Sequence, residues 1–146
     1  MKLLGALFLV FLVSGGARGA PVEPQCPQPR FTDKAPTEYY SRDNPLPDSW
    51  GNRRAGRKIY RGGVIDSVNC AGCHGKKGDG AGPLSGYFDP PPRNFTCEAT
   101  INGTPDGQLF WIIKFGSPGT EMPAHPALSD EQIWQLVLEL RRLAED

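Results

Sequence analysis

Hydrophobic and polar positions follow a helical period in three stretches of this chain. In the first, residues 52–61, the apolar positions share one stripe of a helix: Ala55, Gly56, Ile59 and Tyr60. The two glycines that follow, Gly62 and Gly63, can take the left-handed conformation that ends a helix without steric cost. We therefore expect a helix here that buries one face.

The second stretch runs from Thr104 to Gly116. Thr104 is the expected N-cap, Pro105 suits the first turn, and Gly116 provides the stop. The apolar run at residues 109–113 covers most of the helix circumference. We expect this helix to be surrounded by other parts of the chain.

The third stretch begins at Ser129, with Gln132 at the second position of a capping box. Its apolar residues recur at helical spacing: Ile133, Trp134, Leu136, Val137, Leu140 and Leu143. No segment alternates like a strand. The pattern therefore predicts an all-α fold with three main helices in a domain over residues 50–146.

Residues 20–49 precede this domain and have a different composition. Seven prolines interrupt residues 20–50, and few apolar side chains accompany them. Such a segment predicts an extended, Pro-rich arm that lies on the domain or hangs from it.

Residues 1–19 resemble neither the arm nor the domain. Lys2 is followed by an apolar run over residues 3–13 and then by small residues up to Gly19. The run is too short for a mature transmembrane anchor, so we expect a signal peptide cleaved after Gly19. An uncleaved anchor is the alternative. The first interpretation predicts an exported, periplasmic protein with no stable membrane span.

Charge excludes one class of partner. Of the 16 basic residues, Lys2 and Arg18 belong to the predicted signal peptide, so 14 remain against 16 acidic residues, a net charge of −2. A nucleic-acid binder is not expected at this charge. The first helix nevertheless carries basic residues with no acid between them, and these either steer an acidic partner or form a solvated face: Arg53, Arg54, Arg57, Lys58 and Arg61.

The most specific motif is Cys70-Ala71-Gly72-Cys73-His74. Thiols three positions apart on a helical turn share one face, so both can form thioethers to one edge of a porphyrin. The adjacent His74 is then the proximal iron ligand, which predicts one covalently attached haem c. A zinc site would want a second cysteine pair, and a redox dithiol would want a βαβ context; the sequence offers neither.

Two cysteines remain, Cys26 and Cys97. Once haem takes the other pair, they form the one possible disulfide, and an exported protein meets conditions that permit it. Such a bond would link the arm to the haem domain.

The iron has a second axial position. After signal removal Met122 is the one methionine, and His125 is the one histidine besides His74. Met122 lies in a loop braced by Pro123, where a thioether can be held against iron, and it is the preferred sixth ligand. His125 is the alternative, which would give a centre with two histidines.

Together these features resemble a class I c-type cytochrome of the small, soluble, bacterial kind. The resemblance rests on the order of its parts within residues 50–146: a helix with Gly56 and Tyr60, the Cys70–His74 motif, a Gly-rich stretch up to Pro83, the Met122-Pro123 pair and a closing amphipathic helix. It implies that the first and last helices cross at Gly56, with Trp134 and Val137 opposite. Glu139 departs from the family, where many members have an aromatic residue.

The resemblance also implies roles for two further residues around the haem. A carbonyl near Pro83 would accept a hydrogen bond from the His74 ring, which would raise the donor strength of the imidazole. Arg93 would either meet a haem propionate or remain solvated.

A haem closed by two side chains leaves no site for a substrate, so the expected function is outer-sphere electron transfer rather than enzyme catalysis. The expected partners are an electron donor and an electron acceptor protein. The alternative is a dedicated cytochrome subunit of a periplasmic dehydrogenase or oxidase complex. A haem enzyme or gas sensor would need an open or labile sixth position.

Overall fold

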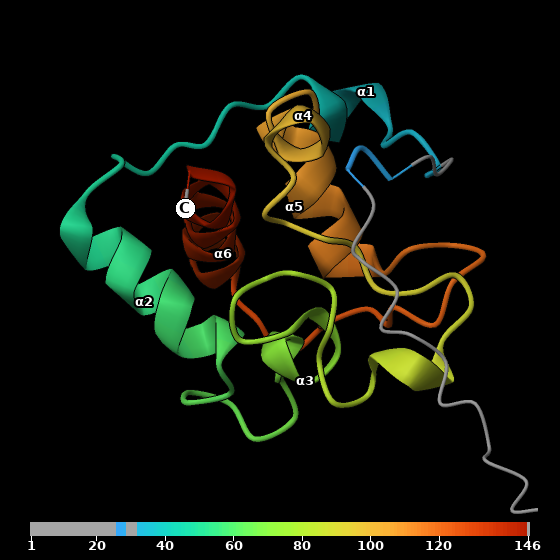
Figure 1. The fold of residues 1–146 in the computed structure, drawn as a ribbon. Coiled ribbons are helices and arrows are strands. Elements are labelled where there is room, and N and C mark those ends of the chain that lie inside the picture. Colours follow the sequence, from blue (N-terminus) through green and yellow to red (C-terminus); the bar gives the residue numbers. More distant parts are fainter. Residues whose placement is uncertain (1–25, 29–31, 146) are drawn as a thin grey trace, which may run out of the picture.

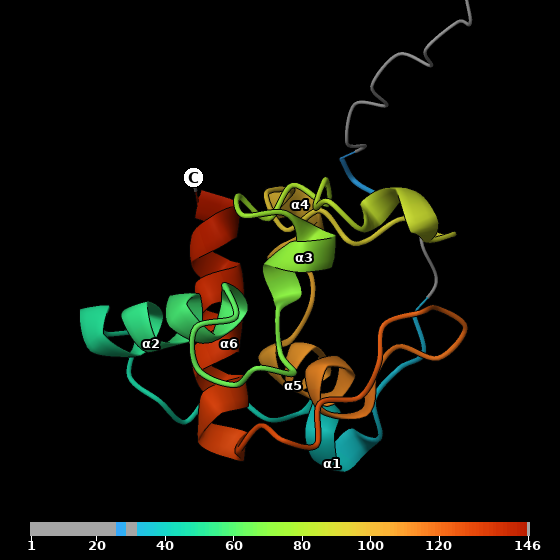
Figure 2. The same ribbon diagram turned by 90° about the horizontal axis from the view of Figure 1, so that it is seen from below.

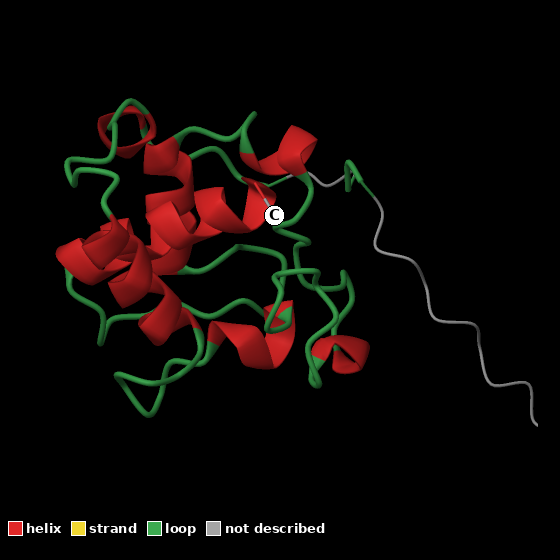
Figure 3. Cartoon of the chain, turned by 60° about the vertical axis from the view of Figure 1, so that its left-hand side comes forward, coloured by secondary structure: helices red, strands yellow, loops and turns green. Residues whose placement is uncertain are grey.

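A computed structural model of the chain describes residues 26–28 and 32–145, so the predicted signal peptide at residues 1–19 lies outside the described residues. Over the described ranges all regular elements are helical, which confirms the predicted all-α fold (Figure 3). Three helices are long: α2 (Trp50–Tyr60), α5 (Asp106–Phe115) and α6 (Asp130–Glu145). The short elements are α1 (Thr37–Tyr40), α3 (Cys70–His74), the 3-10 turn η1 (Ser85–Tyr87) and α4 (Glu98–Ile101).

Helix α2 begins slightly earlier than the sequence pattern predicts. The Ser49 side chain caps it by accepting a hydrogen bond from the Asn52 amide at 3.3 Å, which leaves Trp50 as the first helical residue. Gly62, at a φ of 78°, follows its C-terminal end. The buried stripe contains Gly56, Ile59 and Tyr60, whereas Ala55 is half-buried.

Helix α6 has the predicted capping box. The Ser129 amide donates to Oε1 of Gln132 at 2.9 Å, and the Gln132 amide donates to Oγ of Ser129 at 3.2 Å. Each residue thus satisfies an amide that has no partner within the helix. The capping-box prediction is confirmed.

The predicted N-cap of α5 is wrong. Thr104 uses its hydroxyl to donate to the Thr100 carbonyl at 2.8 Å, in the turn after α4, and Pro105 takes the cap position with no side-chain cap. The hydroxyl has a nearer acceptor in the preceding turn, so it does not serve the helix that follows. The stop at Gly116, with a φ of 84°, is confirmed.

Helices α2 and α6 cross in direct backbone contact at Gly56 (Figures 1 and 2). A Cβ at Gly56 would lie 2.0 Å from the carbonyl oxygen of Gln135 and 3.2 Å from Cβ of Glu139. The residues opposite the glycine are therefore Gln135 and Glu139, not the expected Trp134 and Val137. Trp134 instead stacks on Phe110 of α5, with ring centroids 4.3 Å apart.

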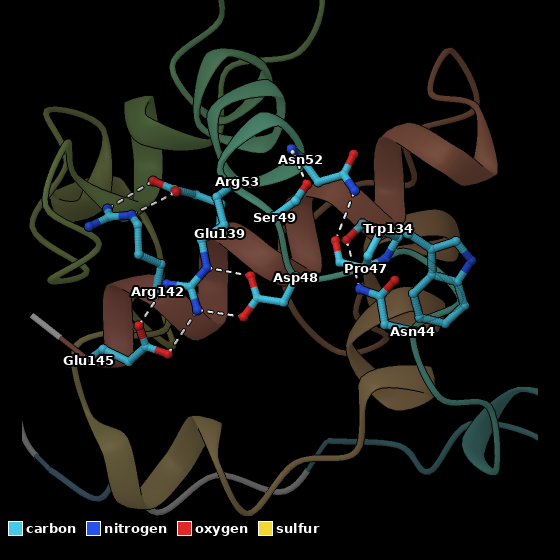
Figure 4. Close-up of polar contacts among 10 residues, drawn as sticks. All are labelled: Asn44, Pro47, Asp48, Ser49, Asn52, Arg53, Trp134, Glu139, Arg142 and Glu145. Carbon is cyan, nitrogen blue, oxygen red and sulfur yellow. Dashed lines mark hydrogen bonds and ion pairs between the residues drawn. The ribbon is translucent and has the colours of Figure 1, made fainter.

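Glu139 occupies this crossing as a buried carboxylate, only 1 % exposed. Arg142 donates to it from Nε at 2.8 Å and from Nη2 at 3.0 Å, and Nε of Arg57 lies 3.5 Å away (Figure 4). A carboxylate away from water requires such partners, because desolvation of a lone charge is costly. The sequence departure at Glu139 is thus compensated by an arginine from each helix.

Ion pairs also involve two of the five basic residues that the sequence analysis grouped as one basic stripe along this helix. Arg53 forms ion pairs with Asp48, from the arm, and with Glu145, at the end of α6 (Figure 4). Arg53 and Arg57 therefore have acidic partners outside α2, in the arm and on α6. The exposed basic residues of the stripe are Arg54, Lys58 and Arg61.

The arm lies on the domain over its described residues. The Ala35 amide donates to Oε1 of Gln108 at 2.7 Å, and Nε2 of Gln108 donates back to the Asp33 carbonyl at 2.9 Å. Tyr39 packs against Phe110, with centroids 6.2 Å apart. These contacts join the arm to α5, so the Pro-rich segment contributes to the core.

Membrane insertion has no candidate element in the part of the chain that the structure describes. No helix within residues 26–28 and 32–145 combines the length and the apolar character that a bilayer span requires.

The crossing at Gly56 generates a stability prediction. The change Gly56→Ala should lower the free energy of unfolding by about 3 kcal/mol, because the added methyl group meets rigid backbone and forces α2 away from α6. Chemical denaturation of the purified protein measures this loss.

Gly51→Ala is the matched control on the same helix. The nearest heavy atom to a Cβ at Gly51 is Oγ of Ser49, at 3.9 Å. Stability should therefore change by less than about 1 kcal/mol. Equal losses in the two variants would contradict the close backbone contact.

Candidate haem site

Helix α3 contains the two thiols and the imidazole of the motif in a single turn. Oδ1 of Asn69 accepts from the Gly72 amide at 3.1 Å and so caps the helix. Gly75 follows at a φ of 80°, which ends the helix directly after His74. Cys70 and Cys73 are not disulfide-bonded. Their spacing on this turn places both sulfur atoms on one face.

The environment of these thiols differs from that of a redox dithiol. Burial raises the pKa of Cys70 to about 11 and also raises the pKa of Cys73. Reactive cysteine pairs have lowered pKa values, because the thiolate is their nucleophile. No group of three or more His, Cys, Asp or Glu side chains suited to a metal ion occurs among the described residues.

A hydrogen bond and a ring contact orient the His74 ring. Its Nδ1 lies 2.9 Å from the carbonyl oxygen of Arg93. Since a carbonyl only accepts, Nδ1 is the donor, and the lone pair of the neutral ring resides on Nε2. The ring stacks on Phe95, with centroids 4.4 Å apart. This tautomer suits coordination of iron through Nε2.

The resemblance implied that a carbonyl near Pro83 would accept the hydrogen bond of the His74 ring. The acceptor is instead the Arg93 carbonyl. The segment around Pro83 donates hydrogen bonds to backbone carbonyls of α3. The Gly82 amide donates to the Cys73 carbonyl at 3.1 Å, and the Leu84 amide donates to the Gly72 carbonyl at 3.0 Å. Pro83 therefore flanks the motif, while the loop before Phe95 supplies the partner of the ring.

Tyr60 connects α2 to the same motif. Its hydroxyl donates to the Gly75 carbonyl at 2.8 Å, and burial raises the pKa of Tyr60 well above its usual value. The hydroxyl therefore stays protonated and remains a donor. The end of α2 and the end of α3 are held together by this bond.

Met122 lies in a compact loop between α5 and α6. The Ser117 amide donates to the Met122 carbonyl at 3.1 Å, and the Met122 amide donates to Oγ1 of Thr120 at 3.2 Å. A Cβ at Gly116 would lie 2.9 Å from the Met122 carbonyl oxygen, so the glycine permits this close return of the chain. The Met122 side chain is half-buried and packs on the core.

His125 follows in the same loop and turns toward α5. Its Nδ1 lies 3.0 Å from the Ile113 carbonyl oxygen, and its amide donates to the Lys114 carbonyl at 3.3 Å. The imidazole thereby anchors the loop to the C-terminal end of α5.

The thiols, the imidazoles and the thioether described above all line one cavity of about 650 Å³. Cys70, Cys73, His74 and Met122 all line it, and so does His125. Large apolar side chains form much of the remaining wall: Phe88, Phe95, Ile101, Leu109, Ile113, Leu136 and Leu140. The volume is within the range of cofactor pockets, and the donors match a porphyrin that is bound by thioethers and axial ligands. The residues present therefore fit a covalent haem.

The arm reaches this cavity. Pro27, Gln28, Thr32 and Lys34 belong to its lining, as does Arg93. The Arg93 guanidinium donates from Nη1 to the Gln28 carbonyl at 3.0 Å and lies 3.5 Å from Oγ1 of Thr32. The arginine side chain thus has hydrogen-bond partners in the arm, which the sequence did not predict. A contact with a haem propionate stays a prediction.

The arm is also bonded covalently to the domain. Cys26 and Cys97 form a disulfide, as the sequence predicts, and Cys97 is 1 % exposed. Gln28 was not singled out in the sequence analysis, and the stacking of Phe95 on the His74 ring was not predicted there. Neither residue belongs to a recognisable motif, and Gln28 reaches the loop beside His74 through its hydrogen bonds to residues 92–94.

Comparison with known proteins gives a family and one informative structure. The cytochrome c family model matches residues 54–143, more than half of the chain. A chain from the reducing HAO-like protein complex of Kuenenia stuttgartiensis has a similar fold, with a TM-score of 0.55 and 29% sequence identity. The similarity covers 70% of the present chain and 49% of that chain, so the present protein spans about half the length of this structural relative. The search of curated proteins returned no match.

The disulfide generates the prediction of this subsection. The double variant Cys26→Ser/Cys97→Ser should lose about 4 kcal/mol of unfolding free energy, because the bond removes closure entropy of a 71-residue separation from the unfolded chain. Denaturation with guanidinium measures the loss, and mass spectrometry of non-reduced wild-type peptides should recover the two cysteines in one linked species. Two free thiols in the wild-type protein would contradict the bond.

Proposed function

Since the chain belongs to the cytochrome c family, we propose that it is a periplasmic electron carrier with one haem c, bound through Cys70 and Cys73 and ligated by His74 and Met122. Members of this family are typically electron carriers rather than enzymes. The haem iron would supply the one-electron chemistry, and the protein would set its potential and its access to partners.

The observation that carries this proposal is the shared cavity. Two thiols on one helical face, an adjacent imidazole and a thioether from a distant loop all line the same apolar space. Closure of the iron by a second side chain leaves no position for a substrate, which favours transfer of electrons through the haem edge.

Met122 is favoured over His125 as the sixth ligand, although both line the cavity. The His125 ring is already engaged by the Ile113 carbonyl at the end of α5, where it stabilises the loop. The Met122 side chain packs on the core beside this loop and has no such polar contact to give up.

A location outside the cytoplasm rests on two observations. The apolar N-terminal run is typical of an export signal. A disulfide between Cys26 and Cys97 is favoured in an oxidising compartment and disfavoured in the cytoplasm.

A dedicated subunit of a larger redox complex is the second candidate. One specific observation favours it: the structural relative with 29% identity belongs to a protein complex. Purification of the tagged protein from its native source distinguishes the two functions. Stable recovery of a larger enzyme favours the subunit, and recovery of the cytochrome alone favours the free carrier.

Covalent attachment gives the first prediction for this function. Acid-acetone treatment of the denatured protein should leave all haem with the polypeptide, because thioethers to Cys70 and Cys73 survive when iron coordination is lost. Absorbance of the separated fractions measures the distribution. Haem in the solvent fraction would overturn the assignment.

The sixth ligand gives the second prediction. Met122→Ala should abolish the sulfur-to-iron absorption band of the oxidised protein, permit carbon monoxide binding by the reduced protein and lower the reduction potential, because a thioether favours the reduced metal. Absorption spectroscopy and redox titration measure these three changes.

His125→Ala is the matched control from the same loop. It should keep the sulfur-to-iron band and exclude carbon monoxide, although the loop loses its anchor to Ile113. If His125→Ala changes the spectrum and Met122→Ala leaves it intact, the centre has two histidine ligands.

A further inference from the structure

A series of hydrogen bonds runs from the arm to the proximal histidine. Its last bond joins Nδ1 of His74 to the Arg93 carbonyl at 2.9 Å. Gln28, a residue outside the 54–143 span that the family model matches, accepts hydrogen bonds from the Arg93 side chain and from the amide of the next residue, Asn94. The acceptor that orients the imidazole is therefore positioned by the arm.

Gln28 contacts three consecutive residues of this loop. Its Oε1 accepts from the Asn94 amide at 2.8 Å, and its backbone carbonyl accepts from Nη1 of Arg93 at 3.0 Å. Its Nε2 donates to the Pro92 carbonyl at the longer distance of 3.5 Å. The peptide unit between Arg93 and Asn94 contains both the carbonyl that faces His74 and the amide that faces Gln28. One side-chain oxygen thus restrains the plane of that peptide.

Two further features make this restraint rigid. Cys26, two residues before Gln28, is bonded to Cys97, three residues after Asn94. Asn94 is buried at 3 % exposure, and its Oδ1 accepts from the amide of Thr96 at 2.9 Å and from the hydroxyl of that residue at 2.7 Å. The arm and the loop therefore have little freedom to move apart.

We propose that Gln28 is a positioning residue for the proximal haem ligand: it holds the Arg93–Asn94 peptide so that the Arg93 carbonyl accepts the Nδ1 proton of His74. This inference rests on the proposed function, because it takes His74 to be an iron ligand. Through this contact the arm lowers the reduction potential of the haem.

The sign follows from the chemistry of the imidazole. A ring N–H that donates to a carbonyl makes the other nitrogen more basic, and a more basic ligand stabilises the oxidised, more positive iron. A weaker bond to the Arg93 carbonyl reduces this stabilisation. Loss of the Gln28 restraint therefore raises the potential.

The test compares Gln28→Ala and Gln28→Asn with the wild-type holoprotein. Both variants deprive the Asn94 amide of its Oε1 acceptor. Gln28→Ala truncates the side chain, and Gln28→Asn shortens it by one methylene group, so its oxygen no longer reaches the amide. At a fixed solution potential, the ratio of reduced to oxidised haem should rise about threefold. The Nδ1 proton of His74 should exchange faster with solvent in proton NMR spectra, because its hydrogen bond is weakened.

Asn44→Ala is the matched control. Nδ2 of Asn44 donates to the Trp134 carbonyl at 3.0 Å, so this change also removes a bond between the arm and the domain (Figure 4). Asn44 does not line the cavity. The control should leave the haem ratio and the His74 proton exchange at their wild-type values.

Unchanged haem ratio and unchanged proton exchange in Gln28→Asn would overturn the inference, and so would equal shifts in Asn44→Ala. Gln28→Asn retains a polar side chain of similar size, so it decides the question if Gln28→Ala does not fold. Failure of the proposed function has a separate signature, since the wild-type protein itself would then release its haem or bind carbon monoxide.

Discussion

The structure depends on the direct backbone contact of α2 and α6 at Gly56. A methyl group there would overlap the Gln135 carbonyl, so no other side chain permits the helices to approach as closely. This approach fixes the end of α2, from which Tyr60 reaches the Gly75 carbonyl beside the cysteine motif. The crossing thereby determines where the thiols and the imidazole stand relative to α6, which provides part of the cavity wall.

Features governed by local chemistry were predictable from sequence. The capping box at Ser129 needs only two residues of one helical turn, and the stop at Gly116 needs one left-handed residue. The Cys26–Cys97 bond was predictable for a different reason, because the haem motif uses the other two cysteines. In each case the number of possible partners is small.

Features decided by distant partners were not predictable. Thr104 fits the sequence pattern of a helix N-cap, yet its hydroxyl donates to the Thr100 carbonyl in α4 instead. The His74 ring has its acceptor at Arg93, because the amides around Pro83 are directed to the carbonyls of α3. Glu139 is a buried carboxylate at the helix crossing, and its burial depends on Arg57 and Arg142. No short sequence window contains these competing partners.

The arm packs on α5 through Ala35 and Tyr39, so the folding unit of this protein includes the arm as well as the domain. The family match begins at residue 54, inside α2, and ends at 143, before the Glu145 carboxylate that pairs with Arg53. A chain shortened to those limits would begin within the crossing helix and would uncover the face of Phe110 that Tyr39 now protects. The segment that the family model matches is therefore smaller than the segment that packs as one unit, and the Pro-rich arm belongs to the packed unit.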